Sequence, residues 1–265
     1  MDFVERILKR QIGLEIDPNF VEAYYNLGIL HQKLRSIQKA KSYYEKTIEI
    51  DPNYSRAFNN LGNILESLGD NKKAINSYEK AIEIDPNFVE AISNLGIIHH
   101  RLNSIQKATS YYEKAIEIDP GYSEAYYNFA VMYGTLGEDE KAKSYYKKAI
   151  EINPNFINAL FNFATLFAKS GEDQKAIDYF EQVIKIDPNH ANAYYGLGVH
   201  YMSMKQYQKS KNFFEKSLSL NSTDKKTKAG YGHLLIHLLE FTKAFKFIRE
   251  GEGVIKFTQS DHKII

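Results

Sequence analysis

The sequence contains no cysteine and no tryptophan, and only six of its 265 residues are proline. Without cysteine, the chain has no disulfide scaffold, no thiolate zinc site and no cysteine nucleophile. Charge of either sign is not in excess, because 34 Lys and Arg residues balance 33 Asp and Glu residues. This balance argues against a basic arm or an acidic tail, so we expect no nucleic acid partner.

A long hydrophobic run is also lacking. No apolar stretch approaches the roughly 18 residues that a membrane-spanning helix needs, so we expect no insertion into a membrane. Asp2 and Glu5 stand near the N-terminus, where a secretory signal peptide has only basic residues before its apolar segment. We therefore expect a cytoplasmic, intracellular location.

The few prolines are evenly spaced, and this spacing organises the whole sequence. One proline occurs every 34 residues, at Pro18, Pro52, Pro86, Pro120, Pro154 and Pro188. A fixed period of this size indicates a repeat architecture rather than one or two compact domains. We number each repeat from three residues after its proline.

This numbering predicts the following domain organisation. Six full repeats run over 21–54, 55–88, 89–122, 123–156, 157–190 and 191–224. Residues 1–20 are predicted to be a partial repeat or cap helix at the N-terminus. Residues 225–250 are predicted to be a degenerate seventh repeat with capping helices, and 251–265 a C-terminal tail.

Each repeat has the pattern of two amphipathic helices. Apolar or small residues recur at repeat positions 4, 7, 8 and 11, and again at 20, 24, 27 and 28, which is the spacing of one helix face. Gly or polar residues near position 15 separate the two stripes, and Asp-Pro-Asn or a close variant ends the second helix. Each repeat is therefore predicted to be an antiparallel helical hairpin.

Two small positions predict how the helices of a hairpin pack. Position 8 is Gly or Ala in all seven repeats, and position 20 is Ala except for Ser210. Small side chains let two helices approach closely, and a large ring at position 24 is expected to fill the space beside the crossing. Those rings are Tyr44, Tyr78, Tyr112, Tyr146, Phe180 and Phe214.

A 34-residue hairpin with these residues, and with Pro at position 32, resembles the tetratricopeptide repeat. The resemblance is strong over 21–224. It departs from the family pattern in lacking Trp at position 4, in Ser222 at the place of a seventh proline, and at position 27 of three repeats. The resemblance implies an all-α fold, an α-solenoid of 34-residue helical hairpins that forms a right-handed superhelix with a concave groove. The residues themselves indicate that no repeat buries its apolar face alone, so stacking is required.

If the resemblance holds, positions 2, 5, 6, 9, 12 and 13 face the groove and bind a protein or peptide partner. Position 6 is asparagine in five successive repeats: Asn26, Asn60, Asn94, Asn128 and Asn162. A primary amide matches the donor and acceptor of a peptide backbone, and the series is similar to the asparagine ladder of O-GlcNAc transferase. The alternative is that the series carries no binding function, because asparagine is common at this position in the family.

Further groove residues are predicted at positions 5 and 9. They are Tyr25, Tyr127, Phe161 and Tyr195 at position 5, and Asn63 at position 9. Aromatic residues are the usual energetic centres of protein interfaces. The two-carboxylate clamp of repeats that bind chaperone C-termini requires Lys at position 5 and Asn at position 9, and this set is absent.

No set of residues has the spacing of a catalytic, metal or cofactor site. Gly196-Leu197-Gly198 lacks the third glycine of a phosphate loop and lies within a predicted helix. His233 and His237 are one helical turn apart, which suits zinc, but no third ligand is evident. His31 and His99, at position 11, are expected to pack with a hydrogen-bonded ring tip. We predict no catalytic residues, no metal and no cofactor.

The sequence leaves three functional interpretations open. The first is a non-enzymatic scaffold that binds an extended peptide across repeats one to six. The second is a substrate-recognition module of a larger enzyme, of glycosyltransferase or oxygenase type. The third is a self-associating assembly factor that forms homo-oligomers through its terminal repeats.

Overall fold

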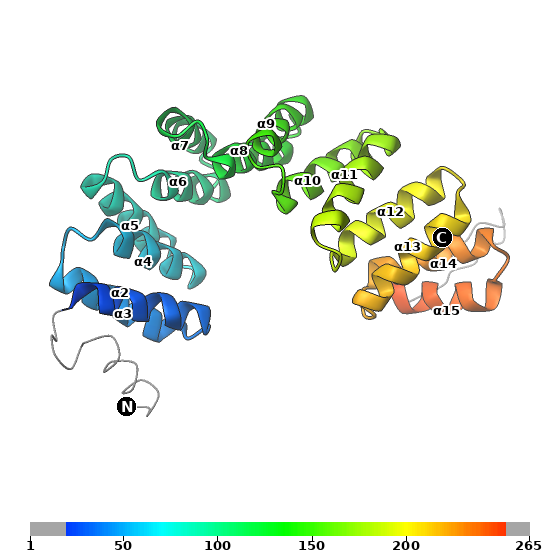
Figure 1. The fold of residues 1–265 in the computed structure, drawn as a ribbon, viewed down its shortest axis with the longest axis horizontal. Helices are drawn as coiled ribbons and strands as arrows, with labels where there is room; N and C mark the ends of the chain where they lie inside the picture. Colours follow the sequence, from blue (N-terminus) through cyan, green and yellow to red (C-terminus); the bar gives the residue numbers. More distant parts are fainter. Residues whose placement is uncertain (1–19, 253–265) are drawn as a thin grey trace. The chain divides into compact units, whose positions relative to one another are not determined.

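The computed structural model describes residues 20–252 of the chain. Within this range it contains fourteen α-helices and no β-strand, arranged as seven antiparallel pairs (Figure 1). The all-α prediction, a solenoid of 34-residue helical hairpins, is therefore confirmed. The predicted N-terminal partial repeat, apart from residue 20, and the tail from 253 onward lie outside the described residues.

The helix bounds repeat with the period of the sequence. The first helices are α2 (Val21–Lys33), α4 (Ser55–Ser67), α6 (Val89–Arg101), α8 (Ser123–Thr135), α10 (Ile157–Lys169), α12 (Ala191–Ser203) and α14 (Lys225–His237). The second helices are α3 (Ile37–Ile50), α5 (Asn71–Ile84), α7 (Ile105–Ile118), α9 (Asp139–Ile152), α11 (Asp173–Ile186), α13 (Tyr207–Leu220) and α15 (Phe241–Glu252). The seventh hairpin ends at Glu252, two residues beyond the predicted boundary at 250.

The turn between the two helices has the same backbone conformation in every repeat. Position 15 has a positive φ in all seven: Arg35, Gly69, Asn103, Gly137, Gly171, Lys205 and Leu239. In the second repeat, the N–H groups of Gly69 and Asp70 donate to the carbonyls of Glu66 and Leu65, both at 2.9 Å. This left-handed C-terminal cap ends the first helix. It also explains why glycine recurs at this position, since glycine adopts the conformation without steric cost.

The close crossing of the two helices is confirmed. A Cβ atom added to Gly28 or Gly62 would lie 2.5 Å from a ring carbon of Tyr44 or Tyr78, respectively. The position-24 rings are nearly inaccessible, with Tyr44, Tyr78 and Phe214 at 0% exposure. At Gly28 and Gly62, glycine is therefore required by the ring that packs on it.

The chain divides into two compact parts, Met1–Phe129 and Ala130–Ile265, with the boundary inside α8. In the N-terminal part, one buried cluster joins side chains of the first three hairpins. In the C-terminal part, a second cluster joins Phe214 of the sixth repeat to Tyr231 and Leu234 of the seventh. Apolar faces are thus buried between successive hairpins, as expected for stacked repeats.

A second aromatic contact recurs within the hairpins. In five repeats the ring at position 11 stacks on the ring at position 23. The pairs are His31–Tyr43, His99–Tyr111, Tyr133–Tyr145, Phe167–Tyr179 and Tyr201–Phe213. In His99, Nδ1 is buried without a hydrogen-bond partner, and burial lowers the pKa of the ring. Stacking on Tyr111 positions the imidazole, and the hydrogen bond expected at the ring tip stays a prediction.

Enlarging Ala108 to leucine tests the helix crossing. Ala108 is completely buried at position 20 of the third repeat. Added methylene groups there force neighbouring side chains out of their rotamers, so we expect Ala108→Leu to lower the free energy of unfolding by about 1–3 kcal/mol.

The measurement is urea unfolding followed by far-ultraviolet circular dichroism. Gln106→Leu introduces the same side chain at an exposed position of the same helix and is expected to shift stability by less than about 0.5 kcal/mol. Equal midpoints for wild type and Ala108→Leu would contradict the crossing.

Candidate functional site

The side chains at positions 2, 5, 6, 9, 12 and 13 of the first helices define a surface that we call the first-helix face. In the N-terminal part, its position-6 asparagines connect successive repeats. Each amide donates to the position-5 side chain of the repeat before it. The bonds are Asn60 Nδ2 to Tyr25 Oη at 3.2 Å, Asn94 Nδ2 to Asn59 Oδ1 at 2.9 Å, and Asn128 Nδ2 to Ser93 Oγ at 3.3 Å.

This series extends into a larger polar network. Asn63 Oδ1 accepts from the Tyr78 hydroxyl at 2.7 Å and from Asn94 Nδ2 at 3.2 Å. The same hydroxyl lies 2.7 Å from a carboxylate oxygen of Glu66, which pairs with Arg101. Burial and the Glu66 contact raise the pKa of Tyr78 above its ordinary value. The first-helix face of this part is therefore polar, and its hydroxyl groups stay protonated.

The contacts give the ladder asparagines a packing role in the free protein. The amide N–H groups of Asn60, Asn94 and Asn128 donate hydrogen bonds to the preceding repeat. Among the described residues, no group donates a hydrogen bond to Oδ1 of Asn94 or Asn128. Asn26 is exposed, and Asn162 and Tyr127 are half-buried. Tyr25 packs against Tyr54, with ring centroids 5.0 Å apart.

The C-terminal part has a pocket on its first-helix face. Its volume is about 400 Å³, and it lies between α10, α11, α12 and the start of α14. Phe161 and Tyr195, both predicted as groove residues, line it together. The pocket is also lined by Thr165, Val199, His200, Asp224 and Lys226, which were not named among the predicted groove residues. Thr165, Val199 and Lys226 occupy positions 9 and 2, so the repeat numbering alone was sufficient to find them.

Two linked changes in sequence accompany this pocket. In the first four repeats, a position-24 tyrosine is followed by a position-6 asparagine in the next repeat; after Phe180 and Phe214 the corresponding residues are Gly196 and Gly230. The Tyr44 hydroxyl contacts Asn60 Nδ2 at 3.4 Å, and burial raises the pKa of Tyr44 to about 12. A phenylalanine has no hydroxyl to bond.

The glycines let the phenylalanine rings reach the helix backbone. A Cβ added to Gly196 would lie 2.7 Å from two ring carbons of Phe180. One added to Gly230 would lie 3.0 Å from Cε1 of Phe214. Position 6 therefore adds no amide to the surface here, both rings stay buried, and the half-buried aromatic residues that line the pocket are Phe161 and Tyr195.

His200 is held in the wall of the pocket by a neighbouring carboxylate. Its Nδ1 lies 2.7 Å from Asp173 Oδ1, and Ser203 Oγ donates to Asp173 Oδ2 at 2.8 Å. Burial opposes ionisation of Asp173, but the bonds from His200 and Ser203 outweigh it and lower the pKa of the carboxyl below its ordinary value. The hydroxyl donates to the carboxylate rather than to the imidazole, so this is not the arrangement of an activated serine nucleophile.

The other candidate motifs have structural roles. His233 Nε2 pairs with Glu252 at 2.8 Å, and the His237 ring stacks on Tyr207. The two histidines therefore do not converge, and the described residues contain no group of three or more metal-ligating side chains. Gly196-Leu197-Gly198 lies inside α12, where both glycines contact phenylalanine rings.

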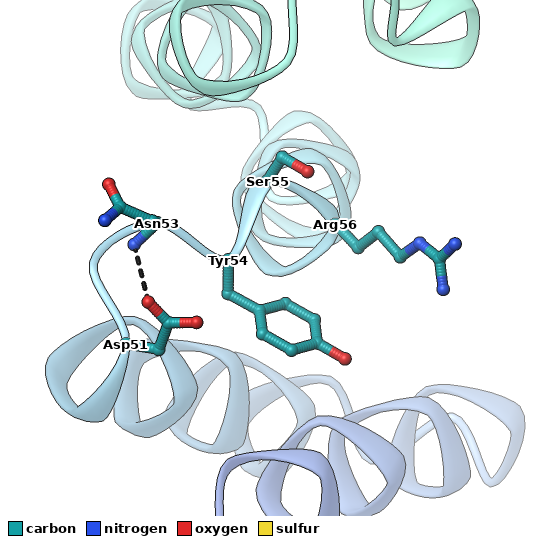
Figure 2. Close-up of a pocket in the computed structure, with 5 residues that line it drawn as sticks. All are labelled: Asp51, Asn53, Tyr54, Ser55 and Arg56. Carbon is teal, nitrogen blue, oxygen red and sulfur yellow. Dashed lines mark hydrogen bonds between the residues drawn. The ribbon is translucent and has the colours of Figure 1, made fainter.

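A smaller hollow lies at the start of α4. Figure 2 shows Asp51, Asn53, Tyr54, Ser55 and Arg56 around it. The Asn53 N–H donates to Asp51 Oδ1 at 2.9 Å, which closes the turn after α3. The Asn53 and Arg56 side chains point away from each other (Figure 2), so they do not form a convergent binding site.

Family models match the repeats directly. Three tetratricopeptide repeat models match the chain: one at 21–54, 89–122 and 191–224, a second at 123–156, and a third at 43–76 and 145–178. A further model, described as TPR repeat, matches 62–103 and 164–205. These matches leave no gap between residues 21 and 224. The chain therefore belongs to the tetratricopeptide repeat family, whose fold generally serves as a non-catalytic scaffold for protein–protein interaction.

Solved structures with the same fold have low sequence identity to the chain. The APC/C hetero-tetramer Cut9-Hcn1 matches with a TM-score of 0.73 and 16% identity, over 87% of this chain and 45% of that one. PilF of Pseudomonas aeruginosa matches with a TM-score of 0.69 and 19% identity, over 82% of this chain and 97% of that one. YrrB, described as a TPR protein with an unusual peptide-binding site, matches with a TM-score of 0.52 and 24% identity, over 74% and 97%.

The chain thus spans less than half of the Cut9-Hcn1 chain that it matches. The search of curated proteins found no match. None of the helices in 20–252 has the length and apolar character that crossing a membrane requires.

Replacing Gly196 and Phe180 tests the link between positions 6 and 24. We expect Gly196→Asn alone to lower the free energy of unfolding by about 1–3 kcal/mol, because the Phe180 ring occupies the space of the new side chain. Phe180→Tyr supplies a hydroxyl that the new amide can bond.

The measurement is a double-mutant cycle by urea unfolding. We expect the double variant to be more stable than the sum of the single effects by at least about 0.5 kcal/mol. Strict additivity would show that the two positions are independent.

Stability at low pH tests the contacts of Asp173. Since the folded-state pKa of Asp173 is lowered, its ionised form stabilises the fold above the ordinary pKa of 3.8, and this contribution is lost as the pH falls through the folded-state value. We therefore expect Asp173→Asn to be less stable than wild type at neutral pH, with the difference vanishing in acid.

Urea unfolding across this pH range checks the result. Asp178→Asn is the control, because Asp178 is an exposed residue of the same helix whose recorded bond is with Gln174. A stability difference for Asp173→Asn that does not change with pH would contradict the assignment.

Proposed function

We propose that the chain binds extended segments of a partner protein on its first-helix faces. The main support is the regular series of position-6 amides in the N-terminal part, together with the aromatic pocket of the C-terminal part. Both features lie on the first-helix face. A scaffold that buries a partner on this surface needs polar groups for the backbone and apolar sites for side chains, and the chain offers both.

The geometry of the repeat suits an extended strand. Neighbouring helices pack about 8–10 Å apart, and an extended chain advances about 3.3 Å per residue. One amide per repeat therefore meets about every third residue of a bound segment. In this proposal, Oδ1 of Asn94 and Asn128 accept backbone N–H groups, while their Nδ2 atoms keep the bonds to the preceding repeat.

The aromatic residues supply the second kind of contact. Phe161 and Tyr195 are half-buried in the free chain, so each still has apolar surface to bury against a partner. Large aromatic side chains bury much area at a low entropy cost, which makes them frequent anchors of interfaces. The peptide-binding site named for YrrB, which has the same fold, is consistent with this use of the repeats.

Removing three ladder amides tests the proposal. We expect Asn60→Ala, Asn94→Ala and Asn128→Ala together to weaken binding of a partner segment by about tenfold or more, since each lost hydrogen bond contributes about 0.5–1.5 kcal/mol. The probe is a peptide selected on the wild-type chain from a randomised display library, and its affinity is measured by calorimetry.

The matched control replaces Asn53, Asn87 and Asn155, which are exposed asparagines of the turns after the second helices. We expect this control to bind as wild type does. Circular dichroism at the temperature of the titration verifies that all three proteins are folded. Undiminished affinity of the ladder variant would remove the amides from the binding site, and failure to select any peptide would refute the proposed function.

A further inference from the structure

We propose that the pocket of the C-terminal part binds a large apolar side chain, aromatic or leucine-like, from a partner segment that carries a carboxylate close to that side chain. The carboxylate pairs with Lys226 at the mouth of the pocket. This inference rests on the proposed function and specifies the kind of segment that binds in the C-terminal part.

The pocket has the size and lining for one large apolar side chain. Its volume of about 400 Å³ lies near the lower end of the usual range for ligand sites, about 300–1,000 Å³. Phe161, Phe180 and Tyr195 supply aromatic surface, and Val199 supplies aliphatic surface. Gly196 contributes no side chain, so no amide occupies the space beside the buried Phe180 ring, and the accessible aromatic surface of the pocket comes from the half-buried Phe161 and Tyr195.

The aromatic walls are held by packing within the fold. The Phe161 and Phe180 ring centroids are 5.6 Å apart, and those of Tyr195 and Phe214 are 6.0 Å apart. His200 adds a third restraint, because its ring stacks on Phe180 while Asp173 holds its Nδ1. A pocket whose walls are fixed before binding loses little entropy when a side chain enters.

The charge at the mouth favours an acidic neighbour. Asp224 also lines the pocket, but its Oδ2 accepts from the N–H and the hydroxyl of Thr227, at 2.7 and 2.6 Å, as the N-cap of α14. Lys226 is exposed and has no recorded ion pair among the described residues. By contrast, Lys228 pairs with Glu250 of α15, and Lys211 pairs with Glu240, the residue before α15.

The two preceding repeats place no negative charge at the position of Lys226. Position 2 of the first-helix face is Asn158 in the fifth repeat, Asn192 in the sixth and Lys226 in the seventh. The first turn of α14 also carries the positive end of the helix dipole, which favours a carboxylate nearby. The pocket therefore combines an apolar interior with one available positive charge at its rim.

Peptide selection from a randomised display library tests the proposal. On the wild-type chain we expect enrichment of peptides that place Phe, Tyr, Trp or Leu within a few residues of Asp or Glu. For a selected peptide, replacing the apolar residue by Ala is expected to weaken binding by about tenfold or more. Replacing the acid by Lys is expected to weaken it by about threefold to tenfold, as for a partly exposed ion pair.

Two protein variants connect these effects to the pocket. Thr165→Tyr places a bulky ring at the pocket and is expected to weaken binding by about tenfold. Its control is Thr242→Tyr, because Thr242 is an exposed threonine of the second helix α15 and lies outside the first-helix face. Lys226→Glu is expected to weaken binding of the acidic peptide and to restore affinity for the peptide in which the acid is replaced by Lys. Lys225→Glu, one residue away and outside the pocket, is expected to leave both affinities unchanged.

The outcomes separate this inference from the proposed function. Peptides that are enriched without the apolar and acidic pair, or that bind Thr165→Tyr and Lys226→Glu as tightly as wild type, overturn the pocket assignment while peptide binding stands. Selection of no peptide overturns both. The pocket assignment is supported if Thr165→Tyr loses binding, if Lys226→Glu restores binding of the Lys-substituted peptide, and if both control variants bind as wild type does.

Discussion

The close approach of two helices within each hairpin is the constraint on which the rest of the structure depends. A Gly or Ala at position 8 and a small residue at position 20 let the helices cross, and one large ring at position 24 fills the space beside them. Cβ atoms on Gly28 and Gly62 would lie inside the van der Waals radius of that ring. Because each hairpin is only two helices thick, it buries its remaining apolar face against the next hairpin, and stacking exposes the same positions in every repeat.

The position-6 residue of the next repeat, which lies beside each position-24 ring, determines the chemistry of the first-helix face. Where the ring is tyrosine, the next repeat provides an asparagine at position 6. Asn60 contacts the Tyr44 hydroxyl, whereas Asn94 Nδ2 and the Tyr78 hydroxyl both donate to Asn63 Oδ1. Where the ring is phenylalanine, the next repeat provides Gly196 or Gly230, and the ring packs near the helix backbone. A requirement of internal packing thereby gives the first-helix face amides in one part and an aromatic pocket in the other.

The sequence predicted the fold well because the period, the small positions and the turn are all local signals. It predicted two helices in every repeat and the buried ring at position 24. It named Phe161 and Tyr195 as groove residues, and both line the pocket, but it predicted neither the pocket nor the role of His200, whose place in the wall depends on Asp173 from the preceding hairpin. It also did not anticipate that the amides of Asn60, Asn94 and Asn128 bond to the preceding repeat, because such contacts depend on how two hairpins stack and not on spacing along the chain.

The most direct test asks which face of the hairpins a partner touches. A photoreactive phenylalanine analogue placed at Tyr195, on the first-helix face, is compared with the same analogue at Lys148, an exposed residue of a second helix. After irradiation with a selected peptide, mass spectrometry measures the cross-linked fraction at each position. We expect cross-links from position 195 and none above background from position 148. Equal cross-linking at both positions, or cross-linking at 148 alone, would contradict binding on the first-helix face.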